Sequence, residues 1–455
     1  MSLCQRHLDV SQPCKEVPVM IAHTFQDAFS AEWVKTHLPN RHHDLVILRQ
    51  LIPWQPIIDD LVPLYNPKKG RHGCDLRTLS AVSILARLRD LSDRQVIEYT
   101  QENRYMQYFC NVPDPHLMTF MHPSTLCRFR KRVGPQGIGH IETMVFTCLK
   151  QAGVIDASMS LIDSTVLESP LLYPTDVTLL YKAFHKMALL AAKAQMEPWW
   201  DQAQVKQLWR AYHLDHSKPL AYLGAFYLLF EPALETFAAH LDDLPDSPLK
   251  ARWHQLLETL LILDEQTQLK LEGETHIPER LVSLDDLDAR SIQKGKRHPK
   301  TEFGTTLEFS FNRQGFMITT ENFIGHPNDK TLYGPTLKRF EQRMDSYPDG
   351  AITDRGYRSP KNLKLHSEDL NYVFMGQSSD VDASQKETCI SARSATEGFI
   401  AVAKHLRGFA RSLYRGLEGA KIWTLLNQCA YNLKKVLQLY RDDALSEDVL
   451  MALRL

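Results

Sequence analysis

The sequence predicts a mixed α/β fold: a mixed sheet preceded by a helical domain and interrupted by a large helical insertion. Short apolar runs at 158–166, 305–311, 316–319, 350–354 and 372–375 are typical of strands. Long stretches with helical periodicity precede the first run and separate it from the second. This order of elements is that of a sheet whose strands come from distant parts of the chain.

Composition limits the classes of protein to consider. A chain of 455 residues is too long for one ordinary domain, and 44% hydrophobic residues exclude a disordered or fibrous protein. The net charge of −1 excludes a uniformly basic protein but leaves local nucleic-acid-binding patches possible. Eight dispersed cysteines without a C-x-x-C pair, and no long apolar run, predict a cytoplasmic location and no membrane partner.

Helix signals dominate the first part of the chain, and they predict a helical domain over residues 1–150. Asp75 is a plausible N-cap, and Ser92 with Gln95 forms a capping box. Another helix is predicted to begin at residues 122–125, and a further one to cover 138–151. A sheet-containing core is then predicted over 151–169 and 291–440, a helical insertion over 170–290, and a tail over 441–455.

Two aspartates accompany short apolar strands. Asp163 lies inside the first predicted strand, and Asp354 closes the strand at 350–354. Carboxylates are depleted in strands and costly to bury without a compensating charge. A divalent cation would supply that charge. The alternatives are an aspartate that caps the next turn, or one paired with an arginine such as Arg355.

A third acidic residue, Glu397, lies in a predicted helix with basic neighbours. Glu397 and Lys404 are seven residues apart and share a helical face, which Arg393 joins if the helix starts early enough. Residues 394–397 can alternatively be interpreted as a capping box at a helix start. Between Arg393 and Lys435 there are eight basic and two acidic residues, a balance of 8 − 2 = +6, which favours a nucleic-acid site.

These motifs resemble the catalytic core of bacterial insertion-sequence transposases of the DDE class. The resemblance spans residues from about 45 to 440 and rests on Asp163-Ser164-Thr165, Asp354-Arg355-Gly356-Tyr357, the Arg393/Glu397/Lys404 array, Leu417 to Lys421 and Tyr431 to Lys435. It implies a ribonuclease H-like core in which Asp163, Asp354 and Glu397 hold two Mg²⁺ ions, with Mn²⁺ as a substitute. Two departures are visible: Ile390 replaces a tyrosine common in relatives, and the insertion precedes the hairpin.

The resemblance implies a reaction in two steps. Two cations roughly 4 Å apart activate water and stabilise the leaving 3′ oxygen at a phosphodiester bond. The freed 3′ hydroxyl then attacks target DNA in the same site. Lys404 and Arg407, about one turn apart on the Glu397 helix, would contact phosphates next to the scissile bond, and the alternative for such a basic face is simple exposure to solvent. Arg393 and Arg411 are further candidates for DNA binding.

Candidates for binding the ends of the element lie outside this array. In the segment 124–133, Leu126, Phe129 and Val133 are predicted to face a core, which leaves Arg128, Lys131 and Arg132 for DNA or solvent. Lys294 and Lys296 are weaker candidates for backbone contacts.

The leading hypothesis is therefore a Mg²⁺-dependent DNA transposase that binds terminal inverted repeats, cleaves them and joins the 3′ end to target DNA. The resemblance further implies double-stranded DNA as partner, an active homodimer and a location at the nucleoid. Two alternatives remain: a catalytically silent repressor derived from a transposase, and a structure-specific nuclease without strand transfer.

Overall fold

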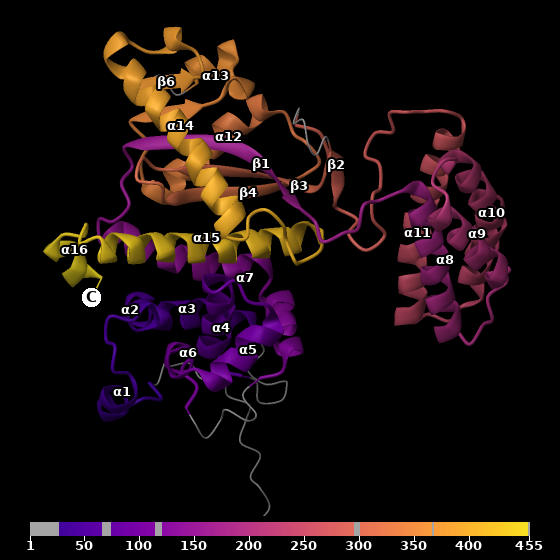
Figure 1. Cartoon of the computed structure of the whole chain (residues 1–455), viewed down its shortest axis with the longest axis horizontal. Coiled ribbons are helices and arrows are strands. Elements are labelled where there is room, and N and C mark those ends of the chain that lie inside the picture. Colours follow the sequence, from indigo (N-terminus) through magenta and orange to yellow (C-terminus); the bar gives the residue numbers. More distant parts are fainter. Residues whose placement is uncertain (1–26, 66–73, 114–120, 295–300, 366–367, 454–455) are drawn as a thin grey trace, which may run out of the picture. The chain divides into compact units, whose positions relative to one another are not determined.

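A computed structural model describes residues 27–65, 74–113, 121–294, 301–365 and 368–453 (Figure 1). By contacts the chain divides into two compact units, which we describe separately. One consists of residues 1–154 and 432–455, and the other of residues 155–431. The sequence had instead predicted that residues 432–440 belong to the sheet-containing core and that 441–455 form a tail.

The first unit is helical. Its core helix is α4, all of whose residues are buried, and the predicted N-cap Asp75 accepts a hydrogen bond from the Thr78 amide. The predicted Ser92–Gln95 capping box starts α5. The helices of this unit within the described residues are α1 (Ala31–His37), α2 (Asp44–Leu51), α3 (Trp54–Leu61), the short η1 (Val62–Leu64), α4 (Leu76–Leu88), α5 (Asp93–Glu102), α6 (Arg104–Cys110), α7 (Pro123–Gln151) and α16 (Glu447–Ala452).

The long helix α7 contains a break. Gly134 adopts φ +62° and ψ −170°, a conformation that is essentially restricted to glycine, and Pro135 follows it. Residues on the two sides of this break therefore form two helical segments. The sequence predicted two helices here, and the break at Gly134 separates them.

A six-stranded mixed sheet forms the centre of the second unit within the described residues. Its path is β2-β3-β1-β5-β6, and β4 also pairs with β3. Strand β1 is antiparallel to β3 on one side and parallel to β5 on the other. The strands are β1 (Met159–Glu168), β2 (Arg290–Ile292), β3 (Glu302–Phe311), β4 (Met317–Ile324), β5 (Gly350–Thr353) and β6 (Tyr372–Met375). The predicted hairpin is β3–β4, joined by a turn with Gly315 at φ +85°.

Helices cover both faces of this sheet. Leu161 of β1 and Phe309 of β3 pack with residues of α14 (Ala383–Leu406) and α15 (Gly416–Arg441). Ile162 of β1 lies on the opposite face and packs with residues of α12 (Asp329–Met344). Figure 1 shows α14 running across the sheet. Short helical segments complete this unit: η3 (Arg355–Tyr357), α13 (Pro360–Lys364) and η4 (Ser378–Asp380).

The predicted insertion is a group of four helices with its own hydrophobic core. Phe226, Phe230 and Phe237 are fully buried in it. Trp253 is fully buried there as well, and the other tryptophans of the segment pack against the same core, as predicted. The helices are α8 (Asp176–Lys193), α9 (Gln202–Leu214), α10 (Pro219–Asp243) and α11 (Pro248–Leu271).

Helix α15 is buried more completely than its apolar stripe predicts. Leu426, Cys429 and Leu433 of the stripe are buried, but so are the polar residues Asn427 and Gln428. The Gln428 amide donates to the Ile318 carbonyl of β4 and accepts from the Thr320 hydroxyl. Periodicity alone could not reveal these contacts, because they depend on a strand more than 100 residues away. None of the described helices is long and apolar enough to cross a membrane.

Candidate active site

Strand register places Asp163 and Asp354 together. In the parallel pair β1–β5, Leu161 lies beside Ile352. Two residues further along, Asp163 lies in the middle of β1, on the same face as Leu161, and Asp354 directly follows the end of β5. The two aspartates therefore lie near each other at the C-terminal end of β5. The two aspartates are 191 positions apart in the chain, so only folding brings them together.

Asp163 is largely buried, with 15% of its side chain exposed. Its Oδ1 accepts the Ser164 amide at 2.7 Å, and its Oδ2 lies 3.1 Å from Nη2 of Arg393. Burial raises the pKa of Asp163 from 3.8 to about 6; the Arg393 charge opposes this shift and the neighbouring Asp354 charge adds to it. The carboxylate therefore has less compensating charge than its burial requires.

Asp354 caps the short turn that follows β5. Its Oδ1 accepts the Gly356 amide of η3 at 2.8 Å. Arg355 does not pair with it: the Arg355 Nε donates to the Gly376 carbonyl at 3.0 Å. At Asp354 the capping alternative is therefore present and pairing with Arg355 is not, whereas at Asp163 the pairing with an arginine is present, with Arg393 as the partner.

Glu397 lies in the middle of α14, which begins at Ala383. The capping-box interpretation of residues 394–397 is therefore wrong, since no helix starts there; the Thr396 hydroxyl instead donates to the Ala392 carbonyl within the helix. Glu397 is 71% exposed, and its Oε1 lies 3.7 Å from Arg393 Nη2. Arg393 thus stands between Asp163 and Glu397 and contacts both.

Among the described residues, no group of three or more His, Cys, Asp or Glu side chains is arranged to hold a metal ion. Two of the three predicted ligands, Asp163 and Asp354, are nevertheless neighbours with oxygen donors of the type that Mg²⁺ prefers. The third, Glu397, is connected to Asp163 by the Arg393 guanidinium, which contacts both carboxylates. The donor chemistry fits a magnesium ion at the two aspartates, and Glu397 would join them only if Arg393 moved.

The other predicted phosphate contacts in this unit are mostly engaged by protein groups. Lys404 Nζ lies 3.2 Å from Thr165 Oγ1 and 3.7 Å from Glu302 Oε1, so it packs against the sheet. Lys294 Nζ donates to Ser164 Oγ at 2.6 Å. Arg407 is the residue that ends α14, not a residue within it as expected, and Arg411 is exposed while donating to the Leu171 carbonyl.

In the first unit, the orientation predicted for residues 124–133 is confirmed. Leu126, Phe129 and Val133 are at most 3% exposed. The predicted DNA-contacting residues Arg128, Lys131 and Arg132 are all exposed, although Arg132 lies over the Tyr65 ring. Lys296 lies outside the described residues.

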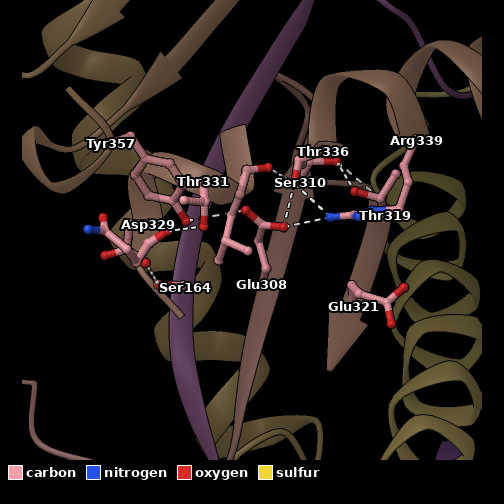
Figure 2. A network of polar contacts seen from close by, with 12 residues as sticks. Ser164, Glu308, Ser310, Thr319, Glu321, Asp329, Thr331, Thr336, Arg339 and Tyr357 are labelled. Carbon is pink, nitrogen blue, oxygen red and sulfur yellow. Dashed lines mark hydrogen bonds and ion pairs between the residues drawn. The ribbon is translucent and has the colours of Figure 1, made fainter. Parts of the chain in front are cut away.

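One set of polar residues next to the aspartates was not identified from the sequence. Glu308 of β3 is only 1% exposed and pairs with Arg339 of α12 at 2.6 Å. Burial raises its pKa from 4.5 to about 7. Figure 2 shows this carboxylate with Thr336, Arg339 and Tyr357 around it. The alternation of apolar and polar residues in β3 is visible in the sequence. The sequence does not show that α12 covers the polar face of this strand and so buries Glu308.

Comparisons with known proteins give one family match and one relative. Residues 33–132 match the family model described as "Transposase domain (DUF772)". The chain is 30% identical over 161 residues to the protein described as "Uncharacterized protein ORF8 in nfe locus" of Rhizobium meliloti, an alignment that covers 35% of this chain and 77% of that protein. No solved structure matches.

The chain thus belongs to the same family as the Rhizobium meliloti protein, and it is a transposase-family protein. The matched transposase domain lies entirely in the helical first unit. Asp163 and Asp354 lie outside that match.

Proposed function

We propose that the protein is a DNA transposase of the DDE class with a ribonuclease H-like core. It binds the terminal inverted repeats of its element as a homodimer, cleaves a phosphodiester bond and joins the 3′ end to target DNA. Asp163, Asp354 and Glu397 are the proposed metal ligands. Arg128, Lys131 and Arg132 are proposed to hold DNA through the first unit, and Lys294, Lys296, Arg393, Lys404, Arg407 and Arg411 through the second.

The observation that carries this proposal is the proximity of Asp163, in the middle of β1, to Asp354, which directly follows the end of the neighbouring parallel strand β5. The register of β1 and β5 brings them together, and the pKa of Asp163, raised to about 6, reflects a buried carboxylate with too little positive charge nearby. Buried carboxylates with a raised pKa are candidates for functional groups, because burying a charge with little compensation does not stabilise the fold.

The cation proposed for this site is Mg²⁺, for which Mn²⁺ would substitute. When bound, it would activate water and stabilise the oxygen that leaves the phosphodiester. Asp163 and Asp354 would hold it, and Glu397 would complete the ligand set. Arg393, which contacts Asp163 and Glu397, would then be released toward the negatively charged DNA backbone.

The experiment combines the purified protein with DNA that carries the inverted repeats flanking its coding region. Wild-type protein with Mg²⁺ or Mn²⁺ should nick the repeat ends, and EDTA should abolish nicking. Asp163→Asn and Asp354→Asn should each reduce the nicking rate by about 100-fold or more while DNA binding is retained. Glu235→Gln, in the separate insertion, is a matched control and should nick normally. Nicking that survives both aspartate changes would refute the proposal.

A second candidate is a DNA-binding protein of transposase origin that does not cleave. The Arg393 guanidinium lies within ion-pair distance of both Asp163 and Glu397, and Glu397 is largely exposed, which favours this candidate. It predicts binding to the repeats without metal-dependent nicking. A nuclease without strand transfer would instead cut the repeats but give no joined products with target DNA.

A further inference from the structure

A polar network lies on the face of the sheet opposite Asp163. In the β1–β3 register, Asp163 pairs with Phe309 and Ser164 pairs with Glu308. Paired residues of neighbouring strands point to the same face, and successive residues point to opposite faces. Glu308 and Ser164 therefore share the face covered by α12, whereas Asp163 faces α14.

Glu308 is the centre of this network. Its Oε2 accepts hydrogen bonds from Thr336 and, at 2.6 Å, from Arg339, and its Oε1 lies 3.5 Å from the Tyr357 hydroxyl. Apolar side chains lie beside it as well: Leu332 and Leu337 belong to the same buried cluster as Tyr357. A buried ion pair is often no more stabilising than apolar side chains of the same volume, so fold stability alone does not account for it.

The network holds the turn that carries Asp354. Tyr357 is fully buried and ends η3, the turn that Asp354 caps. Its hydroxyl faces Glu308, and its carbonyl accepts the Asn362 side-chain amide at 2.8 Å. With both ends of η3 fixed, the Asp354 carboxylate has little freedom to move along the sheet edge.

The network also reaches Asp163 through its neighbour. Ser164 Oγ donates to Asp329 Oδ1 at 2.8 Å and accepts from Lys294 at 2.6 Å, and the Ser164 amide donates to Asp163 Oδ1. Asp329 Oδ2 lies close to Gly356, since a Cβ there would stand 3.1 Å from it and 3.0 Å from Asp354 Oδ1. Figure 2 shows Asp329, Ser164 and Tyr357 close together. Residues of this network therefore lie next to both Asp163 and Asp354.

We propose that Glu308 and Tyr357 are positioning residues that set the Asp354 turn against β1 and so fix the separation of the two aspartates. This inference rests on the proposed function, because it assigns these residues a role in that site. Neither residue is proposed to touch DNA or metal. They act through the η3 turn and through the strand pair β1–β3.

The test removes one buried hydroxyl at a time from the full-length protein. Tyr357→Phe breaks the contact with Glu308. Tyr333→Phe is a matched control: Tyr333 lies in the same cluster, is fully buried, and its hydroxyl has no hydrogen-bond partner among the described residues. Glu308→Gln is a second variant that keeps the shape of the side chain. For each, Mn²⁺ affinity is measured by electron paramagnetic resonance without DNA, alongside the nicking rate and Tm.

Tyr357→Phe and Glu308→Gln should weaken Mn²⁺ binding by about 10-fold or more, the effect typical of groups that orient metal ligands, and should slow nicking with repeat binding unchanged. Tyr333→Phe should change Mn²⁺ affinity less than about twofold. Equal Mn²⁺ affinities in the Tyr357 and Tyr333 variants would overturn the inference. If instead Asp163→Asn and Asp354→Asn retain Mn²⁺ binding and nicking, the proposed function itself fails.

Discussion

At the residue scale, Lys404 shows that a basic residue predicted to contact DNA can instead pair with a carboxylate inside the fold. In the sequence it belongs to a basic array, but its Nζ packs against β1 and lies 3.7 Å from Glu302, whose side chain is 5% exposed. Lys421, from the same array, pairs with Glu321 at 2.7 Å in a more exposed setting, where the side chains are 35% and 28% exposed. The two lysines should therefore differ in their effect on stability.

Lys404→Met is predicted to lower the free energy of unfolding by about 2–4 kcal/mol, because it leaves the Glu302 carboxylate buried with a partner missing. Lys421→Met should cost less than about 1 kcal/mol, since exposed ion pairs contribute little. Urea unfolding followed by circular dichroism measures both. Equal losses of unfolding free energy in the two variants would show that burial of an ion pair does not change its contribution to stability.

At the element scale, the pairing of β3 with α12 makes stability depend on pH through Glu308. Its pKa is raised by burial from 4.5 to about 7. Between these values the folded state keeps a proton that the unfolded state has released, so this group makes the free energy of unfolding fall as pH rises from about 4.5 to 7. Above pH 7 the full loss, on the order of 1–3 kcal/mol, is present.

Glu308→Gln removes this titration while keeping the side-chain shape. We predict that the decrease in the free energy of unfolding between pH 5 and pH 7.5 is smaller in the variant than in the wild type. Urea unfolding at the two pH values gives the comparison. An unchanged decrease, or wild-type stability that rises through this range, would contradict the assignment to Glu308.

Two glycines in helices are predicted to respond in opposite directions. Gly398 follows Glu397 inside α14 with open space around it, so Gly398→Ala should raise the free energy of unfolding by about 0.5–1 kcal/mol. Gly134 also has open space, but its φ of +62° and ψ of −170° disfavour any side chain, so Gly134→Ala should cost about 1–3 kcal/mol.

Thermal unfolding of the two alanine variants tests this directly. At both glycines, the position that a Cβ would take has no neighbouring atom within 4 Å, so packing contributes little and backbone conformation decides the sign. Stabilisation by Gly134→Ala would mean that α7 is not broken at Gly134.

Elements with local signals were predictable from the sequence. The caps Asp75 and Ser92 and the strands around Asp163 and Asp354 depend on neighbours a few residues away. The helix containing Glu397 was predicted, but its start was not, because Ser394 to Glu397 imitates a capping box in mid-helix. A local motif cannot show that the preceding residues are already helical.

At the scale of the whole molecule, the candidate site depends on contacts that no local pattern encodes. Asp163 and Asp354 were predicted to converge, and the β1–β5 register brings them together. The Arg393 contact with Asp163 and the Glu308–Tyr357 network were missed, since each joins segments that are 49 or more residues apart. Such pairings follow from strand order and helix packing, which the sequence indicates only coarsely.

In the active complex, Asp163, Asp354 and Glu397 are proposed to share bound metal. Anomalous scattering from Mn²⁺ in crystals of the protein with its repeat-end DNA would locate that metal. We predict a Mn²⁺ peak within coordination distance of Asp163 and Asp354, with Glu397 brought in and Arg393 moved from Asp163 to a phosphate. A complex in which Arg393 still contacts Asp163, and no peak lies at the two aspartates, would contradict it.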